Sequence, residues 1–539
     1  MSLNAFKLKR FGPIAWVLFP MLAALLLAQA VLQGGAYLLA PVAISSTAIV
    51  LFQTLKNWRT GVILFIAWML FEDLARKYLG NNMAVYFGKD VLAAACYLSF
   101  YTTRGHERRL PVRPAFFLPF MLLFGWSLLE AVNPNSPSLW YGLLGLKLYF
   151  GYVPLFSLGY ALLRNENDLR RFLVLNLSIA GLIAALGTAQ GISGQTLLAP
   201  ADLAQDIRDL GTLMREAPIT HESFIRPTSV FVSDGRFSSY LLLVWLLGFG
   251  TATYFLMLRL PGRKWVVTIM GLFLVAIILS GSRGALLYAL ISAGVITSVF
   301  AREMLWQNTR TRKIGIAVAT TVVLAALAVV FLSTLYPEAL NPRVAFYQQT
   351  LSPSSPTSEL GWRAWGYPVR EFSKAFRYPN WVLGSGIGTR SLGGQYLTRI
   401  LGAPNVTEVV ESGYGNFMLE NGIPGLLLWL VFTGAVITSC WNVVRRLRGT
   451  ALFPVGFVIF WFVFIVLFPA MAGGLSYENF VINAYLCLLL GVLFSLPALS
   501  EANSGPARPP RLGDSLVHVR AVGVSGAPQP VRKSMNLQS

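Results

Sequence analysis

The sequence predicts an all-α fold: a polytopic bundle of transmembrane helices with a large outer loop that contains short helices. The chain has 539 residues, of which 55% are hydrophobic and 12% are charged. Its mean hydropathy of +0.60 is too high for a soluble domain, which cannot bury that much apolar surface. Long apolar runs recur along the chain, and basic residues gather in every second polar segment between them.

The apolar runs predict the individual spans. A span needs about 20 apolar residues to cross the hydrocarbon core of a bilayer, which gives about fourteen spans here. Ala28-Gln29-Ala30 resembles a signal-peptidase site, but the long run before it and the span directly after it favour an uncleaved first span. The approximate ranges of the spans are 12–33, 36–55, 60–79, 89–103, 114–132, 139–163, 171–190, 229–258, 265–279, 285–300, 314–335, 423–441, 451–472 and 479–499.

The basic residues predict the orientation. Lys and Arg concentrate in cytoplasmic loops, and the alternation here closes with both termini in the cytoplasm. This also explains the net charge of +20, so we expect contact with the lipid bilayer and no nucleic-acid partner. The expected regions are N-terminal helices (1–170), central helices with an outer loop at 191–229 (171–335), the large outer loop (336–422), C-terminal helices (423–500) and a disordered basic cytoplasmic tail (501–539).

Ser280-Gly281-Ser282-Arg283-Gly284 lies between two apolar runs that each border a basic loop. We therefore expect Arg283 at the tip of a helical hairpin, on the side of the membrane opposite those loops. A fixed cation there suits an anionic headgroup. The outer loops carry further arginines against the positive-inside trend, and arginine binds phosphate through two parallel hydrogen bonds. Pairing with acids of the same loops is the alternative for about half of them.

Residues Tyr367 to Tyr378 predict a short amphipathic helix flanked by tryptophans. Its apolar and basic side chains suit the membrane interface, and a plain membrane-anchoring lid is an equally good interpretation. Gly384-Ser385-Gly386-Ile387-Gly388 is expected to form a tight turn. The cluster Glu72, Asp73, Arg76 and Lys77 is explained by pairing along one helix, although contact with a substrate stays open.

The remaining chemistry of the sequence is sparse. Cys96, Cys440 and Cys487 all fall within predicted spans, where they suit apolar packing. No acidic cluster has the pattern of a divalent-metal cage, so we expect no metal and no cofactor.

Four segments follow one another in the chain: Ile225–Phe231, Ser280–Ala285, Gly361–Trp365 with the glycine turn 384–388, and Glu411–Tyr414 with Glu420–Leu426. In this order they resemble motifs of the O-antigen ligase and O-antigen polymerase (Wzy) superfamily of membrane glycosyltransferases. The resemblance covers roughly residues 170–500. Histidine and asparagine usually stand in the ligases where this chain has Glu411 and Ser412, which favours a polymerase-like member.

The resemblance implies glycosyl transfer at the periplasmic face of the bacterial inner membrane, from an oligosaccharide linked to undecaprenyl diphosphate. Arg226, Arg283 and Arg363 are the candidates for binding the donor diphosphate and stabilising its departure. Glu411 is the candidate general base, and Arg283 and Glu411 together form the candidate catalytic pair. Pairing of Glu411 with an arginine is the alternative. Further candidate substrate contacts are Arg236, Arg377, Tyr414 and Tyr477.

Three functions remain open from the sequence. The first is polymerisation of lipid-linked repeat units into O-antigen, capsule or exopolysaccharide, with a chain-length regulator and a flippase as expected partners. The second is ligation of a finished glycan to lipid A-core or protein. The third, from another class, is a flippase or transporter of lipid-linked oligosaccharide. Transporters usually show internal repeats and charges near the middle of the membrane. This sequence shows no repeat, and its informative charges cluster at the outer surface, with Lys147 as the main exception.

Overall fold

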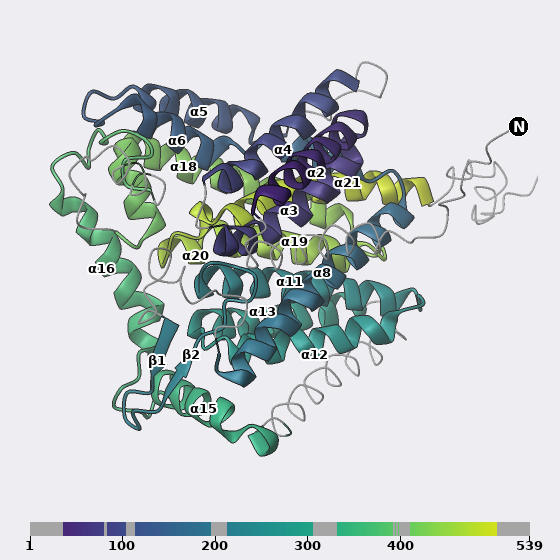
Figure 1. Cartoon of the computed structure of the whole chain (residues 1–539), viewed down its shortest axis with the longest axis vertical. Helices are drawn as coiled ribbons and strands as arrows, with labels where there is room; N and C mark the ends of the chain where they lie inside the picture. The colour runs from purple at the N-terminus through teal and green to yellow at the C-terminus, as the bar shows by residue number, and fades with distance from the viewer. Residues whose placement is uncertain are drawn as a thin grey trace, which may run out of the picture.

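The protein is a bundle of helices with one small β-hairpin (Figure 1). The structure, a computed structural model, describes residues 36–79, 83–103, 114–195, 213–305, 333–391 and 410–503, with Phe331, Gly394 and Leu397 as isolated positions. The expected first span (12–33), nearly all of the span at 314–335 and the tail beyond Asn503 lie outside these residues.

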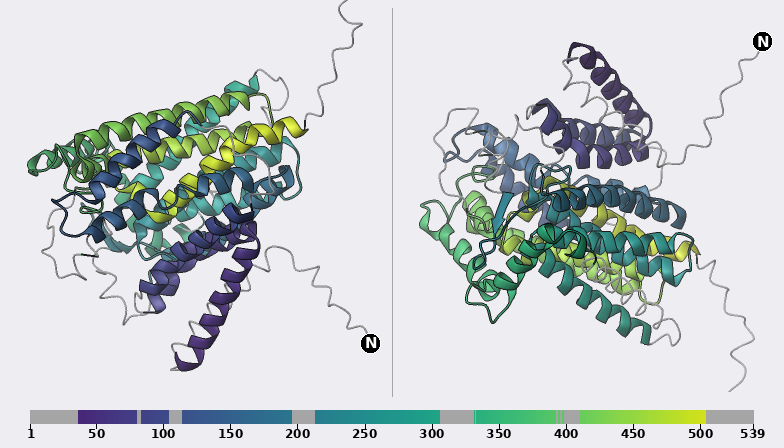
Figure 2. Two further views of the ribbon diagram at one scale, coloured as in Figure 1. Left: turned by 90° about the horizontal axis from the view of Figure 1, so that it is seen from above. Right: turned by 60° about the horizontal axis from the view of Figure 1, so that its bottom comes forward.

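The first half of the bundle consists of α2 to α8. These helices are α2 (Ala36–Lys56), α3 (Trp58–Tyr78), α4 (Met83–Thr103), α5 (Phe117–Ala131), α6 (Leu139–Phe150), α7 (Leu155–Leu162) and α8 (Glu166–Ser193). Both views of Figure 2 show α2, in dark purple, projecting from the side of the bundle.

The second half begins with a β-hairpin that pairs β1 and β2 in antiparallel register. Its elements are β1 (Met214–Glu216), β2 (Ser223–Ile225), α11 (Asp234–Met257), α12 (Arg263–Leu279), α13 (Arg283–Leu305), α15 (Pro337–Leu351), η3 (Trp362–Gly366), α16 (Tyr367–Lys374), η4 (Ala375–Arg377), α18 (Gly413–Arg446), α19 (Phe453–Leu467), α20 (Pro469–Ala472), η5 (Ser476–Glu478) and α21 (Phe480–Asn503).

Seven segments of the described chain are long and apolar enough to cross a membrane, which confirms a helical membrane protein. Each overlaps one predicted span. The total of about fourteen spans remains a prediction. The seven segments are Leu139–Leu162, Glu166–Ser193, Asp234–Met257, Arg283–Glu303, Gly413–Arg446, Phe453–Ala472 and Phe480–Glu501.

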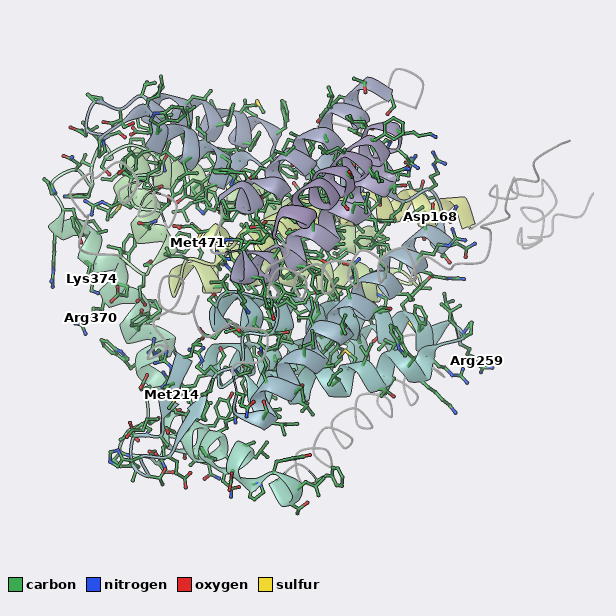
Figure 3. All side chains as sticks on the ribbon, viewed as in Figure 1. Asp168, Met214, Arg259, Arg370, Lys374 and Met471 are labelled. Atoms are coloured by element: carbon green, nitrogen blue, oxygen red, sulfur yellow. The ribbon has the colours of Figure 1, made fainter. Side chains whose placement is uncertain are left out.

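The two ends of the bundle carry different structural elements. One end, here called the loop end, carries the β-hairpin, α15 and α16, and Figure 3 labels Met214, Arg370 and Lys374 there. Figure 3 labels Asp168 and Arg259 at the opposite end, where the junctions α7–α8, α11–α12 and α18–α19 carry basic residues. Successive connections lie at alternate ends because neighbouring helices run antiparallel and are joined by short segments.

The core is centred on α11, α19 and α21, whose apolar side chains are almost all buried. Helices α7 and α21 approach each other through glycine: a Cβ atom at Gly159 would lie 2.1 Å from the carbonyl oxygen of Leu488. A Cβ at Gly491 would lie equally close to the carbonyl oxygen of Phe156. Small residues at such positions let two backbones pack closely in the membrane.

Candidate functional site

The segment Ser280–Gly281–Ser282 forms the turn between α12 and α13, as the sequence predicts. Gly281 has a φ of 65°, which favours glycine. A Cβ atom there would lie 2.5 Å from the ring of Phe224 on β2, so the turn also needs a small residue to pack against the hairpin. Arg283 is the first residue of α13, where the positive end of the helix dipole adds to its own charge.

Four arginines gather around this turn, and two carboxylates pair with three of them. Arg283 lies 2.9 Å from Glu359, which also accepts a hydrogen bond of 3.0 Å from Arg363. Arg226, which follows β2, pairs with Asp234 in the first turn of α11. Arg215 on β1 interacts electrostatically with both Arg226 and Arg283. The three predicted diphosphate-binding arginines therefore lie around one turn of the chain.

These six side chains, here called the arginine cluster, carry four positive and two negative charges and so a formal excess of two positive charges. The cluster consists of Arg215, Arg226, Arg283, Arg363, Asp234 and Glu359.

The cluster also retains hydrogen-bonding capacity. The Nε atom of Arg226 is buried, and no hydrogen-bond partner for it occurs in the part of the chain that the structure describes. Burial lowers the pKa of the Arg226 guanidinium, because it disfavours the charged form. Partial burial alone would raise the pKa of Glu359, but hydrogen bonds from Arg363 and Arg283 outweigh it and hold that pKa below its usual range. An anion with several oxygens would suit this surplus of donors.

Arg343 on α15 lies buried beneath the arginine cluster and does not reach the protein surface. Its guanidinium donates to the carbonyl oxygens of Leu279 (2.9 Å) and Ile225 (2.8 Å), and also to that of Ala339. Its side chain is almost fully buried, and burial lowers the pKa of Arg343 to about 10. Arg343 thus joins the end of α12 to the end of β2, next to Arg283 and Arg226.

A continuous series of contacts connects the arginine cluster with Glu411. The guanidinium of Arg363 lies over the ring of Tyr367, 4.7 Å from the ring centroid. The hydroxyl of Tyr367 in turn donates a hydrogen bond to Glu411. Glu411 is exposed, and its backbone N–H donates to Glu371 on α16 at 3.3 Å. The predicted base therefore does not pair directly with Arg363, since Tyr367 lies between them.

A second charged group, here called the α3–α4 network, lies at the same end and is more deeply buried. Lys89 lies 2.9 Å from Glu72, and both side chains are fully buried. Asp73 accepts two hydrogen bonds of 2.8 Å from Arg236 and one of 3.2 Å from Arg76.

Further contacts extend this network to neighbouring helices. Lys147 on α6 pairs with Asp90 at 2.8 Å, and Lys77 donates to Thr228 and to the carbonyl oxygen of Ser229. The pairing expected along one helix is therefore only part of an arrangement that joins α3, α4, α6 and α11. The same contacts place Arg236, a predicted substrate contact, in this network and not in the arginine cluster.

The other predicted contacts take different positions. Tyr477 is buried; its hydroxyl donates to the carbonyl oxygen of Tyr149, and its ring packs against Trp429. Tyr414 is partly buried and donates to the carbonyl oxygen of Leu467 at 2.7 Å. Arg377 is exposed at the end of the short helix 362–377. Of these three side chains, Arg377 is the one open to a ligand in the structure as it stands.

The glycine-rich segment 384–388 is a tight turn, as expected. Gly384, Gly386 and Gly388 have φ values of 92°, 99° and 85°. The backbone N–H groups of Ser385, Gly386 and Ile387 donate to carbonyl oxygens of Leu419, Glu420 and Glu130, and that of Gly388 donates to the Glu420 carboxylate, so these donors are engaged within the protein. The Glu420 side chain is fully buried and accepts a hydrogen bond of 2.8 Å from the backbone N–H of Arg390.

Sequence reasoning missed three members of the site. Glu359 counted only as one acid among several in its loop, and Tyr367 only as the start of a helix. Arg215 counted only as one outer arginine among others. A signal for Glu359 was available, since Glu359 and Arg363 are four positions apart and such pairs meet on a helix.

Within the described ranges, no group of three or more His, Cys, Asp and Glu side chains is placed to hold a metal ion. The chain matches no family model, no curated protein and no solved structure.

Proposed function

We propose that the protein polymerises oligosaccharide repeat units linked to undecaprenyl diphosphate, by metal-independent glycosyl transfer at the periplasmic face of the bacterial inner membrane. The observation that carries the proposal is the contact series from Arg283 through Glu359, Arg363 and Tyr367 to Glu411. It joins a cation-rich group suited to a diphosphate with an exposed carboxylate suited to accept a proton.

The proposed reaction is a direct displacement at the anomeric carbon of the donor sugar. The acceptor hydroxyl oxygen forms a bond to that carbon, the bond from carbon to the diphosphate oxygen breaks, and the diphosphate departs with the electron pair. Glu411 takes the proton of the attacking hydroxyl. Arg226, Arg283 and Arg363 stabilise the negative charge that develops on the diphosphate. Attack from the face opposite the leaving group inverts the anomeric configuration.

The excess of two positive charges in the arginine cluster supports this assignment. The diphosphate of a lipid-linked sugar carries about two negative charges at neutral pH, so the two groups match in charge. The carboxylates of Asp234 and Glu359 hold the guanidinium groups in place until the donor arrives. The phosphate oxygens of the donor can then replace these carboxylates, because they accept the same paired hydrogen bonds from a guanidinium group and carry more negative charge.

The test uses purified protein in proteoliposomes with a synthetic undecaprenyl-diphosphate repeat unit from the host strain. Wild type forms a ladder of lipid-linked glycans, resolved by length. Arg283→Ala is expected to lower the rate by about 10²–10³-fold, the effect of removing one preorganised transition-state donor. Glu411→Gln is expected to lower it by about 10²–10⁴-fold, the effect of removing a general base.

Arg302→Ala is the matched control, because Arg302 is exposed at the opposite end of the same helix as Arg283. It should retain the wild-type rate. A single transfer that appears only with added lipid A-core or protein would make the protein a ligase. Movement of the donor to the other leaflet without any covalent product would make it a transporter. Full activity of both Arg283→Ala and Glu411→Gln would contradict the assigned site.

A further inference from the structure

Residues 362–377 form one continuous helical rod made of η3, α16 and η4. Figure 1 shows α16 running down the left edge of the molecule, across the end of the bundle and not along it. A helix in this position is roughly parallel to the plane of a membrane that the bundle spans. The chemistry of its three faces therefore indicates what surrounds it.

One face packs on the protein. Glu371 and Ala375, four positions apart, are buried. Phe372 and Ala375 belong to a small apolar cluster with Val410, Met418 and Leu419, which includes the start of α18. This face fixes the rotation of the rod about its own axis, since residues four positions apart lie on the same side of a helix.

A second face is apolar and exposed. Val369 and Phe376 are seven positions apart and lie on one side of the rod, and Trp362 and Trp365 are exposed on the π-helical segment η3 that precedes them. The exposed fractions of Trp362, Trp365, Val369 and Phe376 are 44%, 76%, 49% and 46%. Val382 and Leu383, just beyond the rod, are exposed as well. Contiguous exposed apolar side chains of this size mark a surface that another phase or molecule covers.

The third face is basic. Arg363, Arg370, Lys374 and Arg377 are spaced by seven, four and three positions. Figure 3 shows Arg370 at the outer edge of the molecule. Two of the four basic side chains have acidic partners, since Lys374 pairs with Glu371 at 2.6 Å and Arg363 pairs with Glu359. The guanidinium of Arg370 lies 5.9 Å from the ring centroid of Trp362, so the basic face borders the apolar one. A helix with tryptophan and aliphatic residues on one face and lysine and arginine on the next is typical of the surface of an anionic bilayer.

We propose that the rod 362–377 binds the bilayer surface, with the apolar face in the acyl-chain region and the basic face among anionic headgroups. The occupant is lipid because the spanning helices already place a bilayer beside this end of the bundle, and because the basic face complements anionic headgroups. Binding does not depend on the proposed activity. Binding of the rod to the bilayer nevertheless affects that activity, because the rod carries Arg363 and Tyr367 and would hold both side chains next to the bilayer surface.

The test is spin-label accessibility in proteoliposomes that contain anionic lipid. Labels are attached to Trp365→Cys and Val369→Cys on the apolar face and to Arg370→Cys and Arg377→Cys on the basic face. Unaltered protein gives the background, because Cys96, Cys440 and Cys487 are buried. Collisions with oxygen report contact with lipid, and collisions with a nickel chelate report contact with water.

Labels at positions 365 and 369 are expected to collide mainly with oxygen, and labels at 370 and 377 mainly with the nickel chelate. Equal access of the nickel chelate to positions 365 and 370 would place the apolar face in water and overturn the proposal. Low access of both reagents at 365 and 369 would mean that protein covers the face, which overturns it too. If Trp365→Cys fails to fold, Phe376→Cys tests the same face. Neither readout requires glycosyl transfer, so failure of the proposed function would leave this result unaffected.

Discussion

At the scale of single residues, Glu359 joins two of the candidate arginines. It lies 2.9 Å from Arg283 and accepts a 3.0 Å hydrogen bond from Arg363, while its own side chain is about one-third exposed. Both partners favour its ionised form, and together they hold its pKa below the usual range despite partial burial. A carboxylate of this kind keeps its arginines oriented at neutral pH and releases them when it takes a proton.

Glu359→Gln is expected to remove a component of stability that depends on pH. Because the folded-state pKa of Glu359 is lower than the unfolded value, its contribution is present above the unfolded pKa of about 4.3. It is lost as the pH falls through the depressed folded-state pKa. The difference in melting temperature between wild type and Glu359→Gln in nanodiscs should therefore shrink as the pH falls from 7 to below the unfolded pKa of about 4.3. A difference that stays constant across this range would contradict the assigned ionisation.

Individual residues of the site differ in how far the sequence could predict them. Arg283 stood out because it lies between two apolar runs, and Arg226 and Arg363 stood out because their segments resemble motifs of a known family. Tyr477 is different, because its polar hydroxyl suggested a sugar contact, whereas the structure stacks its ring on Tyr149 and buries it. Whether a tyrosine lies at a surface depends on partners distant in the chain, and Tyr149 lies 328 positions from Tyr477.

At the scale of elements, α3 carries the charges that the sequence explained by pairing along one helix. Their strongest contacts, however, are between helices. Arg236, which binds Asp73 with both carboxylate oxygens, lies 163 positions away. Helix α11 carries this contact two residues after Asp234, the partner of Arg226. The α3–α4 network thus fixes the same helix end that holds the arginine cluster.

Asp73→Asn is expected to destabilise the protein by about 3–5 kcal/mol, since it leaves the charge of Arg236 without its buried partner. Chemical denaturation in detergent micelles would measure the change. The comparison is Glu303→Gln, which removes a more exposed pair at the opposite end, where Arg448 lies 3.8 Å away. That variant should lose no more than about 1 kcal/mol. Equal losses in the two variants would show that the α3–α4 network does not stabilise the fold through this ion pair.

The glycine turn gives a second prediction at this scale. Gly388 has a φ of 85°, and a Cβ atom there would lie 2.2 Å from the carbonyl oxygen of Tyr141 on α6. Gly388→Ala combines an unfavourable backbone conformation with overpacking, so we expect a loss of about 2–5 kcal/mol.

Gly434→Ala is the control, because Gly434 lies within α18 and a Cβ atom there would meet nothing within 4 Å. Alanine in a helix interior is favoured over glycine by up to about 1 kcal/mol. Thermal unfolding of the two variants should therefore move in opposite directions. A stable Gly388→Ala protein would mean that the turn does not pack against α6.

At the scale of the whole molecule, the sequence predicted the class of fold well because hydropathy alone decides which runs enter a membrane. Seven predicted spans coincide with helices that are long and apolar enough to cross it. Hydropathy could not predict how those helices pack against one another. It depends on contacts such as those of α7 with α21 and of α5 with α18, and the sequence contains no periodic signal for either.

The separation of the two ends predicts which residues face each side of the membrane. Met214 at the loop end and Lys264 at the opposite end are both exposed. Met214→Cys should react with a membrane-impermeant maleimide in spheroplasts, and Lys264→Cys should react only in inverted vesicles. Reaction of both from the same side would contradict the orientation and, with it, a periplasmic site.

The packing of α21 against α6 and α7 sets an order for assembly. Asn483 on α21 donates to the carbonyl oxygen of Leu148, 335 positions earlier. At about 5–20 residues per second, synthesis delivers α21 on the order of 20–70 s after α6 and α7. During that interval the glycine face of α7 and the carbonyl oxygens at the end of α6 have no final partner in the bilayer. The nascent protein therefore depends on the translocation machinery or on lipid to cover this surface, and a ribosome stalled before residue 480 would leave an unfinished bundle exposed to membrane proteases.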